Sequence, residues 1–377
     1  MAKLYKDEED AARHEPKLTT MLKWAGNKGI EFTAWPKELL YDTTSNKFVG
    51  FLMDRISSNL VLSECYEING KADYNWQERI LIAYNLCFVV KGVHSIKQVC
   101  GDLNPRNICI NLKEGKLYLL DADSFQIIDG DKIYRCTVAM QQYIPKEILT
   151  KMDHGASLAD IQEPVFTEDS DNFALATHIF QLLMNGCHPF ANALSDIEDD
   201  DHTPPDPVTA IEAGQTPFFK NSAWFTTPAY APKTSDLPPY IQDLFKKAFV
   251  DCYVMGPSCR PTPEDWMKAL KRLMESDLCV CTRDNSHIYY RNLSSCPWCR
   301  LDSSISNVEK QVSAINNETN FMRNIPKSGI PPLKSIGLNM FVSNGKNSGI
   351  PGTVNTKPLK TKIRTKKVKD PKPKTNN

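Results

Sequence analysis

The most extended apolar segment of the chain runs from Trp76 to Ile96 and consists of WQERILIAYNLCFVVKGVHSI. Its hydrophobic side chains would lie on nearly all sides of a helix, so the sequence predicts a buried helix rather than a surface one. The uncharged part is too short to cross a bilayer, because a membrane-spanning helix needs about 20 consecutive apolar residues. We therefore expect a core helix here.

Two short apolar runs, Ile108–Asn111 and Leu117–Leu120, follow that helix and are joined by LKEGK. This pattern predicts a strand, a turn that contains glycine, and a second strand. The polar string CGDLNPRNICI leads into the first strand, and LLDADSFQI places Asp121 and Asp123 where the chain leaves the second. Asp, Asn, Gly and Pro favour turns, so the first string indicates either an ordinary loop or a site.

Three residues around this hairpin resemble the catalytic core of the protein kinase superfamily, whose signature is H-R-D-L-x-x-x-N followed by D-F-G. Asp102, Asn107 five residues on and Asp121 fourteen residues further match its polar positions. The resemblance implies that Asp102 is the base that accepts the proton of an attacking hydroxyl. It implies that Asn107 and Asp121 are oxygen ligands of the Mg²⁺ that bridges the phosphates of ATP.

More of the kinase pattern follows in the expected order. YIPKEI places Pro145 and Glu147 where kinases carry A-P-E, and DSDNFALATHIFQLLMNGCHPF resembles the buried kinase helix that begins with an aspartate. By this resemblance, Asp171 holds the backbone of the catalytic loop, and Arg260 in CRPTPEDW pairs with Glu147. The alternative for that pair is two solvated charges, worth about 0 to 1 kcal/mol.

The beginning of the chain resembles part of a kinase small lobe. AKLYK is similar to the third strand with its phosphate-binding lysine, which is Lys3, and the resemblance makes Glu15 on the following helix its ion-pair partner. FTAWPKELLYD and KFVGFLMDRI are similar to the remaining strands, with Met53 at the hinge that meets adenine. Lysines near a terminus and glutamates on helices are also common as solvated surface residues.

The sequence departs from the kinase pattern in several places. Only two residues precede Lys3, where a Gly-rich hairpin is expected. We therefore expect either a longer gene product, with the hairpin encoded upstream of Met1, or a degenerate kinase that binds nucleotide weakly. Cys100 and Gly101 replace the usual His and Arg, and Asn104 replaces the lysine beside the transferred phosphate. DADSF replaces D-F-G, so no phenylalanine switch is implied there.

Gly101 bears on regulation, because the arginine it replaces normally binds a phosphate on the activation loop. We expect the loop from Asp121 to Glu147 to be ordered by packing instead, and we expect activity not to require phosphorylation of Thr137. The residues expected to supply this packing are Phe125, Ile127, Ile133, Tyr134 and Tyr143.

A second group of candidate ligands lies in CVCTRDNSHIYYRNLSSCPWCR. Cys296 and Cys299 form a C-x-x-C pair, and Cys281 and His287 supply two more donors, a set that suits tetrahedral Zn²⁺. Cys279 competes with Cys281 for one position. The alternative is a group of reduced cysteines at a helix end; a redox role is disfavoured because this C-x-x-C lies in no βαβ context.

Charge is distributed unevenly along the 377 residues, although the net charge is zero. Beyond Arg300 there are 14 Lys and Arg against 4 Asp and Glu, so the preceding part carries a net charge of minus ten. From Leu301 onward Ser, Asn, Gly, Pro and Lys dominate, which predicts disorder. The basic end KPLKTKIRTKKVKDPKPK is interpreted as a solvated tail or as a contact for an acidic protein or nucleic acid through charge alone.

The cysteines and the N-terminal residues indicate a cellular compartment. The 12 cysteines are scattered rather than spaced as a disulfide framework, and MAKLYKDEED is charged, with no apolar signal region. We therefore expect a reducing, cytoplasmic environment and no contact with a membrane.

Together the strings HE-KL-ML, WP-LLY, GFLM, GDLNP-N, D-DSFQI, YRC and CPWC resemble a group of mostly bacterial, atypical serine/threonine kinase-like proteins that end in a cysteine-rich module. The resemblance covers about residues 1–300. It implies an enzyme that uses ATP and Mg²⁺ to phosphorylate Ser or Thr of a protein substrate. The alternative is a pseudokinase scaffold that binds nucleotide weakly and presents a zinc module and a basic tail to partners.

These inferences predict an α+β fold, a two-lobed protein kinase-like fold with an incomplete N-lobe. We expect a partial N-lobe at residues 1–55, a kinase-like C-lobe at 56–277, a zinc-binding module at 278–300 and a disordered basic tail at 301–377. The implied cofactors are ATP, Mg²⁺ and Zn²⁺.

Overall fold

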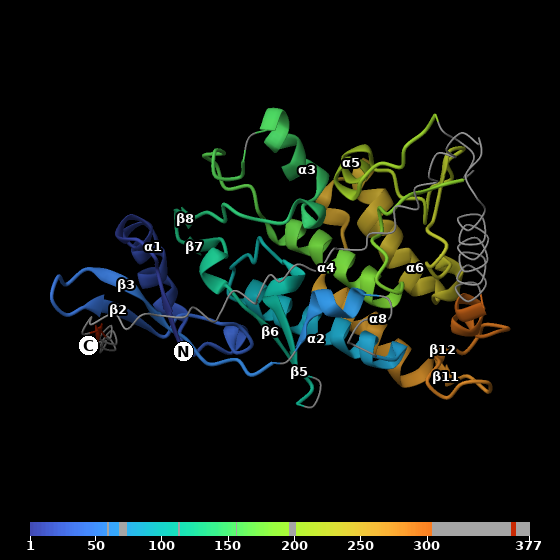
Figure 1. Cartoon of the computed structure of the whole chain (residues 1–377), viewed down its shortest axis with the longest axis horizontal. Coiled ribbons are helices and arrows are strands. Elements are labelled where there is room, and N and C mark those ends of the chain that lie inside the picture. The colour runs from blue at the N-terminus through green and yellow to red at the C-terminus, as the bar shows by residue number, and fades with distance from the viewer. Residues whose placement is uncertain are drawn as a thin grey trace, which may run out of the picture.

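The computed structural model describes residues 1–58, 60–67, 74–111, 114–155, 157–195, 201–303 and 363–366. These residues form an α+β fold of small antiparallel sheets around a helical body (Figure 1). The helices are α1 (Glu8–Met21), α2 (Trp76–Ser95), α3 (Lys146–Leu149), α4 (Glu168–Leu183), α5 (Pro207–Ala213), α6 (Pro239–Lys246), α7 (Cys252–Met255) and α8 (Pro263–Ser276). The strands are β1 (Ala2–Leu4), β2 (Glu38–Asp42), β3 (Phe48–Leu52), β4 (Leu60–Val61), β5 (Ile108–Asn111), β6 (Lys116–Leu119), β7 (Ile127–Asp129), β8 (Lys132–Tyr134), β9 (Ala193–Leu194), β10 (Phe225–Thr226), β11 (Leu278–Val280), β12 (Ile288–Tyr290) and β13 (Ile363–Lys366).

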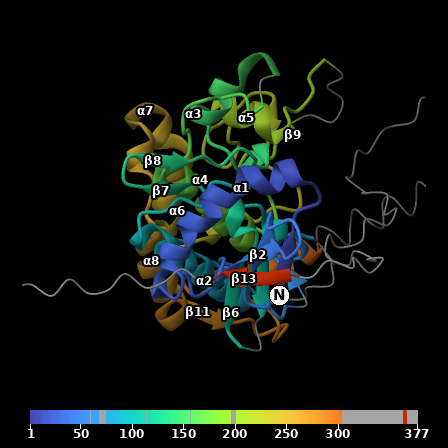
Figure 2. The ribbon, with the colours of Figure 1, turned by 90° about the vertical axis from the view of Figure 1, so that its left-hand side faces the viewer.

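The N-terminal part is an antiparallel sheet in the order β1-β3-β2-β13, against which α1 packs (Figure 2). Lys3 of β1 pairs with Phe51 of β3, the strand that lies between β1 and β2. This pairing fixes the direction of the Lys3 side chain. The strand predicted in FTAWPKELLYD is shorter than expected and begins only at Glu38. The residues before it turn toward the hairpin instead, because Thr33 bridges Leu119.

The helical body is built around α2 and α4. Asn75 caps α2 through the backbone N–H of Glu78, whose side chain returns the bond, and this reciprocal cap fixes where the helix begins. α2 packs against α4 and α8. In α4 every residue from Ser170 to Leu183 is buried. The predicted core helix at 76–96 is therefore confirmed, and no helix in the described part of the chain is apolar and long enough to span a bilayer.

The predicted hairpin is confirmed as β5 and β6, in which Ile108 pairs with Leu119. Gly115 has a φ of +63° at the turn, a conformation that glycine adopts without the strain other residues would carry. Leu119 also binds the N-terminal part on its outer side, since its N–H donates to Phe32 O at 2.9 Å and its carbonyl accepts from Ala34 N–H at 2.8 Å. The hairpin thus joins the helical body to the N-terminal sheet.

The C-terminal module contains the β11–β12 hairpin and packs against the helical body. The Trp298 ring lies edge-on to Trp76 of α2, with ring centroids 6.0 Å apart. Arg300 forms an ion pair with Asp236, and Tyr240 Oη donates to Asp277 at 2.7 Å. The contacts of Trp298 and Arg300 attach the module to the body, and that of Tyr240 holds Asp277, the residue before β11.

The basic tail at 301–377 falls outside the described residues, except for residues 301–303 and β13. Ile363–Lys366 pairs antiparallel with Leu39–Asp42 of β2 and occupies the edge of the N-terminal sheet. Those four residues form a strand, where the sequence predicts disorder.

Candidate active site and metal site

Asp171, in the first turn of α4, fixes the loop that precedes β5. Its carboxylate accepts the backbone N–H groups of Cys100 at 2.8 Å and Gly101 at 2.9 Å. His94 Nε2 lies 2.9 Å from the same carboxylate. Asp171 is 1% exposed, and these three partners compensate for the cost of burying a carboxylate. The prediction that Asp171 holds the backbone of this loop is confirmed.

Asp102 lies next in the loop and is partly buried. Its Oδ1 accepts the backbone N–H of Met140 at 3.2 Å. Burial raises the pKa of Asp102 to about 6; the Met140 N–H opposes this shift, and the nearby Asp121 adds to it. An aspartate with this pKa is still ionised at neutral pH and is a stronger base than an ordinary one, as a general base requires.

Asn107 and Asp121 meet at the open end of the β5–β6 hairpin. The N–H of Leu120, the residue before Asp121, donates to Asn107 O at 2.7 Å, which extends the strand pairing by one step. Asp121 has φ +54° and ψ +36°, the left-handed region that residues other than glycine seldom adopt. Such strain is characteristic of functional sites. The backbone pairing thus places Asn107 and Asp121 at the same end of the hairpin, and their role as Mg²⁺ ligands stays a prediction.

Lys3 reaches this end of the hairpin from β1. Its Nζ lies 2.5 Å from Asp121 Oδ1 and 2.8 Å from each carboxylate oxygen of Asp123. Tyr5 Oη donates to Asp123 Oδ2 at 3.2 Å. Burial alone would lower the pKa of Lys3, but Asp123 and Asp121 outweigh it and raise the pKa, so the ammonium stays charged.

The predicted ion pair between Lys3 and Glu15 is not formed. Glu15 instead accepts a hydrogen bond from Tyr41 Oη at 2.7 Å. Burial and then this contact with Glu15 raise the pKa of Tyr41 to about 12. The buried face of α1 carries Lys17 rather than Glu15, and the carboxylate that reaches Lys3 comes from Asp123 in the 3₁₀ turn Ala122–Ser124.

Met53 follows β3 and pairs with the first residue of the chain. Its N–H donates to Met1 O at 2.9 Å, and its carbonyl accepts from the amino group of Met1 at 2.7 Å. Both main-chain groups of Met53 are therefore engaged in the N-terminal sheet. A role for this segment in binding adenine stays a prediction.

Two residues that replace kinase-typical ones have local structural roles. Asn104 Oδ1 accepts the N–H of Arg106 at 3.0 Å and caps the 3₁₀ turn Pro105–Asn107. Gly101 has a φ of +73°, and a Cβ there would lie 2.8 Å from both Cβ and Sγ of Cys136. Only glycine lets the later loop approach the catalytic loop this closely.

The loop from Asp121 to Glu147 is packed much as the sequence predicts. Phe125, Ile127 and Tyr143 are buried, and Tyr134 Oη lies 3.0 Å from Thr20 Oγ1 of α1. The expectation is wrong for Ile133, which is 39% exposed.

Glu147 and Arg260 form the predicted ion pair in a bidentate geometry. Arg260 Nη1 and Nη2 lie 2.5 Å and 2.9 Å from the two carboxylate oxygens, and Nη1 also donates to Asp169 O at 3.1 Å. Arg260 is 4% exposed and its guanidinium lies over the ring of Phe173. The alternative of two solvated charges is wrong.

Three residues that lie near Asp121 were not predicted from the sequence as part of the candidate site: Tyr5, Lys17 and Asp123. Lys17 is 7% exposed, and burial lowers its pKa to about 8 against the influence of Cys136, Asp123 and Asp121. For Asp123 the only available signal was its position two residues after Asp121. For Lys17 there was none, because a single lysine in a highly charged helix resembles a surface residue.

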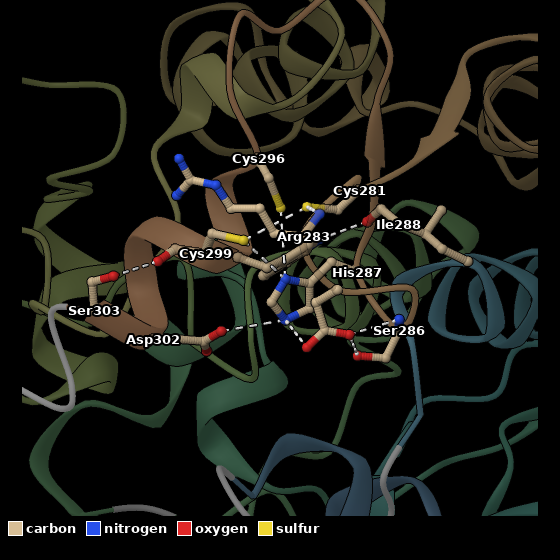
Figure 3. Close-up of polar contacts among 11 residues, drawn as sticks. Cys281, Arg283, Ser286, His287, Ile288, Cys296, Cys299, Asp302 and Ser303 are labelled. Atoms are coloured by element: carbon tan, nitrogen blue, oxygen red, sulfur yellow. Dashed lines mark hydrogen bonds and ion pairs between the residues drawn. The ribbon is translucent and has the colours of Figure 1, made fainter.

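The four predicted zinc ligands, Cys281, His287, Cys296 and Cys299, gather in the C-terminal module, with donor atoms within 4.8 Å of one another (Figure 3). Cys281 Sγ and Cys299 Sγ are 3.6 Å apart, and His287 Nδ1 is 3.4 Å from Cys299 Sγ and 3.8 Å from Cys296 Sγ. A tetrahedral zinc site with Zn–S bonds of about 2.3 Å has sulfur–sulfur edges of about 3.8 Å. The donor set and its spacing therefore fit Zn²⁺. Of the two cysteines that the sequence left open, the cluster contains Cys281 and not Cys279.

Neighbouring groups orient these donors. His287 Nε2 lies 3.3 Å from Asp302 Oδ2 and 3.8 Å from Asp284 Oδ2, which directs Nδ1 toward the thiols. The N–H of Arg283 donates to Cys281 Sγ at 3.3 Å, and this bond, with that of Asp284, lowers the pKa of the Cys281 thiol. The first arrangement presents His287 Nδ1 to the thiols, and the second favours the thiolate of Cys281, the form that binds a metal.

The described features are consistent with a protein kinase-like fold: an aspartate on a loop held by Asp171, Asn107 and Asp121 at one hairpin end, and Glu147 paired with the buried Arg260. No protein-family model matches the chain. Two curated proteins, both named protein kinase YegI, are similar to it, one from Escherichia coli strain K12 and one from Escherichia coli O157:H7. Each is 27% identical over 307 residues, which cover 80% of this chain and 45% of the relative. The chain thus spans somewhat less than half the length of these relatives, and the similarity is that of a distant homologue of a bacterial protein kinase.

Proposed function

We propose that this chain carries an ATP- and Mg²⁺-dependent protein kinase activity directed at Ser or Thr of a protein substrate. The observation that carries the proposal is the backbone pairing of Asn107 with Leu120, which sets Asn107 beside the residue that precedes Asp121, while Asp121 is close enough to Asp102 to influence its pKa. The distant similarity to a protein kinase supports the same reaction class.

The residues have separate roles in the proposed reaction. Asp102 orients the substrate hydroxyl and accepts its proton, for which its raised pKa is suited. Asn107 and Asp121 would hold Mg²⁺, which neutralises charge on the phosphates when bound. Lys3 supplies a further positive charge to the phosphates from β1.

A pseudokinase scaffold is the second candidate, and one observation favours it. Lys3 Nζ is bound by both Asp121 and Asp123, so two of the groups needed for Mg²⁺ and ATP neutralise each other. A scaffold would keep this arrangement when nucleotide is added, whereas an enzyme must open the contact between Lys3 and Asp121.

The test is phosphate transfer from radiolabelled ATP to a mixture of protein substrates, with Mg²⁺, by the wild type, Asp102→Ala and Asp129→Asn. Asp129 is the matched control, because it is a partly exposed carboxylate on β7 that pairs with Lys23 at 2.5 Å. We expect Asp102→Ala to lower transfer by about 100-fold, in line with loss of a general base, and Asp129→Asn to change it less than about twofold. Equal transfer by the wild type and Asp102→Ala would rule out the enzyme.

We also propose that Zn²⁺ binds Cys281, His287, Cys296 and Cys299 and holds the C-terminal module together. The module has little apolar interior of its own, since β11 and β12 are only partly buried. Four thiol and imidazole donors at tetrahedral spacing would then supply its core.

A further inference from the structure

We propose that Asp123, rather than a glutamate of α1, is the positioning residue that holds Lys3 toward the phosphates; this inference rests on the proposed function. In the kinase pattern that this chain resembles, a lysine of the small lobe is paired by a glutamate from the following helix. Here the partner comes from the turn that also carries Asp121.

Asp121 and Asp123 are only two residues apart, yet their surroundings differ. The Asp123 side chain is 7% exposed, whereas that of Asp121 is 38% exposed. Asp123 contacts Lys3 through both carboxylate oxygens and also accepts from Tyr5 Oη, so its oxygens are occupied from β1. Asp121 contacts Lys3 through one oxygen only. The exposed carboxylate is therefore the one with room for a metal, and the buried one is the one that stays on the lysine.

The charges around Asp123 support a permanent ion pair. A buried carboxylate is costly unless it is paired and hydrogen-bonded. Lys3 supplies two contacts and Tyr5 a third, and the buried Lys17 of α1 lies close enough to contribute to the same field. When a metal occupies Asp121, Asp123 still balances the charge of Lys3.

Glu15 does not take this part in the observed arrangement, where Lys3 contacts Asp121 and Asp123 and one Glu15 oxygen accepts from Tyr41 Oη of β2. Tyr5 reinforces the difference, since its ring stacks on His14 of α1 while its hydroxyl binds Asp123. Lys3 is thus held by Asp123 in the 3₁₀ turn that directly follows Asp121. The position of the lysine therefore follows that turn and not the orientation of α1.

The experiment is a double-mutant cycle on the full chain with Lys3→Met, Asp123→Asn and the double variant. The kcat and KM for ATP are measured for each, with Asp129→Asn as the matched Lys–Asp control. We expect Asp123→Asn to lower kcat/KM for ATP at least tenfold and the double variant to be no worse than Lys3→Met alone, because Asp123 acts through the lysine. Asp123→Glu, which keeps the charge, should recover part of the loss.

Glu15→Gln provides the direct comparison, and we expect it to lower kcat/KM by less than about threefold. The inference is overturned if Glu15→Gln costs as much as Asp123→Asn, or if the losses of Lys3→Met and Asp123→Asn multiply in the double variant. A wild type without transfer activity would contradict the proposed function instead. The affinity for Mg-ATP is then measured by calorimetry for the wild type and the three variants. The role of Asp123 is overturned if no Mg-ATP binds, or if Lys3→Met and Asp123→Asn change the affinity independently of each other.

Discussion

Asp102 shows how the fold adjusts a single side chain for chemistry at a cost in stability. The carboxylate is partly removed from water, and its backbone partner, Met140 N–H, only partly offsets this burial. Its pKa rises from 3.8 to about 6 as a result. Between these two values the folded chain binds a proton that the unfolded chain does not, so the ionised form of Asp102 opposes folding above about pH 6.

Two consequences follow for the pH dependence of the protein. The rate measured as kcat/KM should fall as the pH is lowered through about 6, because the base must be ionised to accept a proton. Asp102→Asn should lower transfer by about 100-fold, as loss of the base does, yet raise the thermal midpoint at pH 7.5, since it removes a partly buried charge. The gain should shrink at pH 4.5, where Asp102 is protonated in the folded wild type.

Thermal unfolding of the wild type and Asp102→Asn at both pH values, with Asp129→Asn as the control, checks this prediction. A loss of stability at pH 7.5, or a gain of the same size at both pH values, would show that the charge of Asp102 does not oppose folding.

The closeness of Asn107 and Asp121 along the chain could be predicted from the sequence because one short hairpin joins them, and the hydrophobic pattern shows that hairpin. The roles of these two residues and of Asp102 come from the kinase resemblance and stay predictions. The partner of Lys3 could not be predicted in the same way. Glu15 and Asp123 are both carboxylates within reach of a small-lobe strand, and only the packing of α1 against β3 and the turn decides which of them meets the lysine. Similarly, Cys279 lies within β11 and Cys281 directly follows its last residue, Val280, so the point at which the strand ends selects the ligand, and the sequence does not show that point.

At the scale of elements, the segment between β6 and α4 is held by contacts that need no phosphate. Cys136 packs directly against Gly101, and the backbone N–H of Met140 donates a hydrogen bond to Asp102. The start of the segment pairs with the catalytic loop, where Gln126 and Val99 exchange backbone hydrogen bonds. Its end is anchored by Glu147 on the buried Arg260.

These contacts lead to a prediction for Thr137. Thr137→Ala and phosphatase treatment should each lower transfer at saturating ATP by less than about tenfold, equivalent to about 1.4 kcal/mol of barrier. Gly101→Ala should be far more harmful, because its Cβ would lie 2.8 Å from Cys136 at a φ of +73°. Transfer rates and thermal midpoints of both variants test this, and a larger loss in Thr137→Ala than in Gly101→Ala would reveal a phosphate switch.

The ion pair of Glu147 and Arg260 makes a separate prediction about stability. Glu147→Gln should lower the free energy of unfolding by about 1 to 3 kcal/mol, because it leaves a buried guanidinium without its counter-charge while the 37% exposed Glu147 side chain is partly screened by water. Adding Arg260→Met should restore part of that loss, since it removes the unpaired charge and keeps an apolar stem beside Phe173. Urea unfolding of Glu147→Gln and of the double variant with Arg260→Met tests this prediction. A double variant that is less stable than Glu147→Gln alone would contradict it.

At the scale of the whole molecule, the C-terminal module is a small unit attached to a large one. Its hairpin is short, and its four donor side chains gather between the hairpin and the helical turn that carries Cys299. Trp298 and Arg300 attach it near the N-terminus of α2 and beside α6. The two units should therefore respond differently to loss of a metal.

We expect one zinc per chain by metal analysis, and none in Cys296→Ser/Cys299→Ser. In that variant residues 278–303 should become sensitive to protease, whereas the helical body should retain its cooperative thermal transition. Cys279→Ser is the matched control, since Cys279 lies outside the donor cluster, and it should keep its zinc. If the double variant retained as much zinc as the wild type, the proposed zinc site in the module would be wrong.

The edge-on contact of Trp76 with Trp298 has a spectroscopic consequence. Trp298 stands between the donors Cys296 and Cys299, and its indole N–H donates to Ile288 O at 2.6 Å, so its ring moves only if the module moves. Trp76 belongs to the buried start of α2. Two indoles 6.0 Å apart exchange excitation energy and shield each other from aqueous quenchers. The protein therefore carries its own fluorophore pair, and an increase in red-shifted, acrylamide-quenchable emission above that of the exposed Trp224 would report the module leaving the body without any attached label.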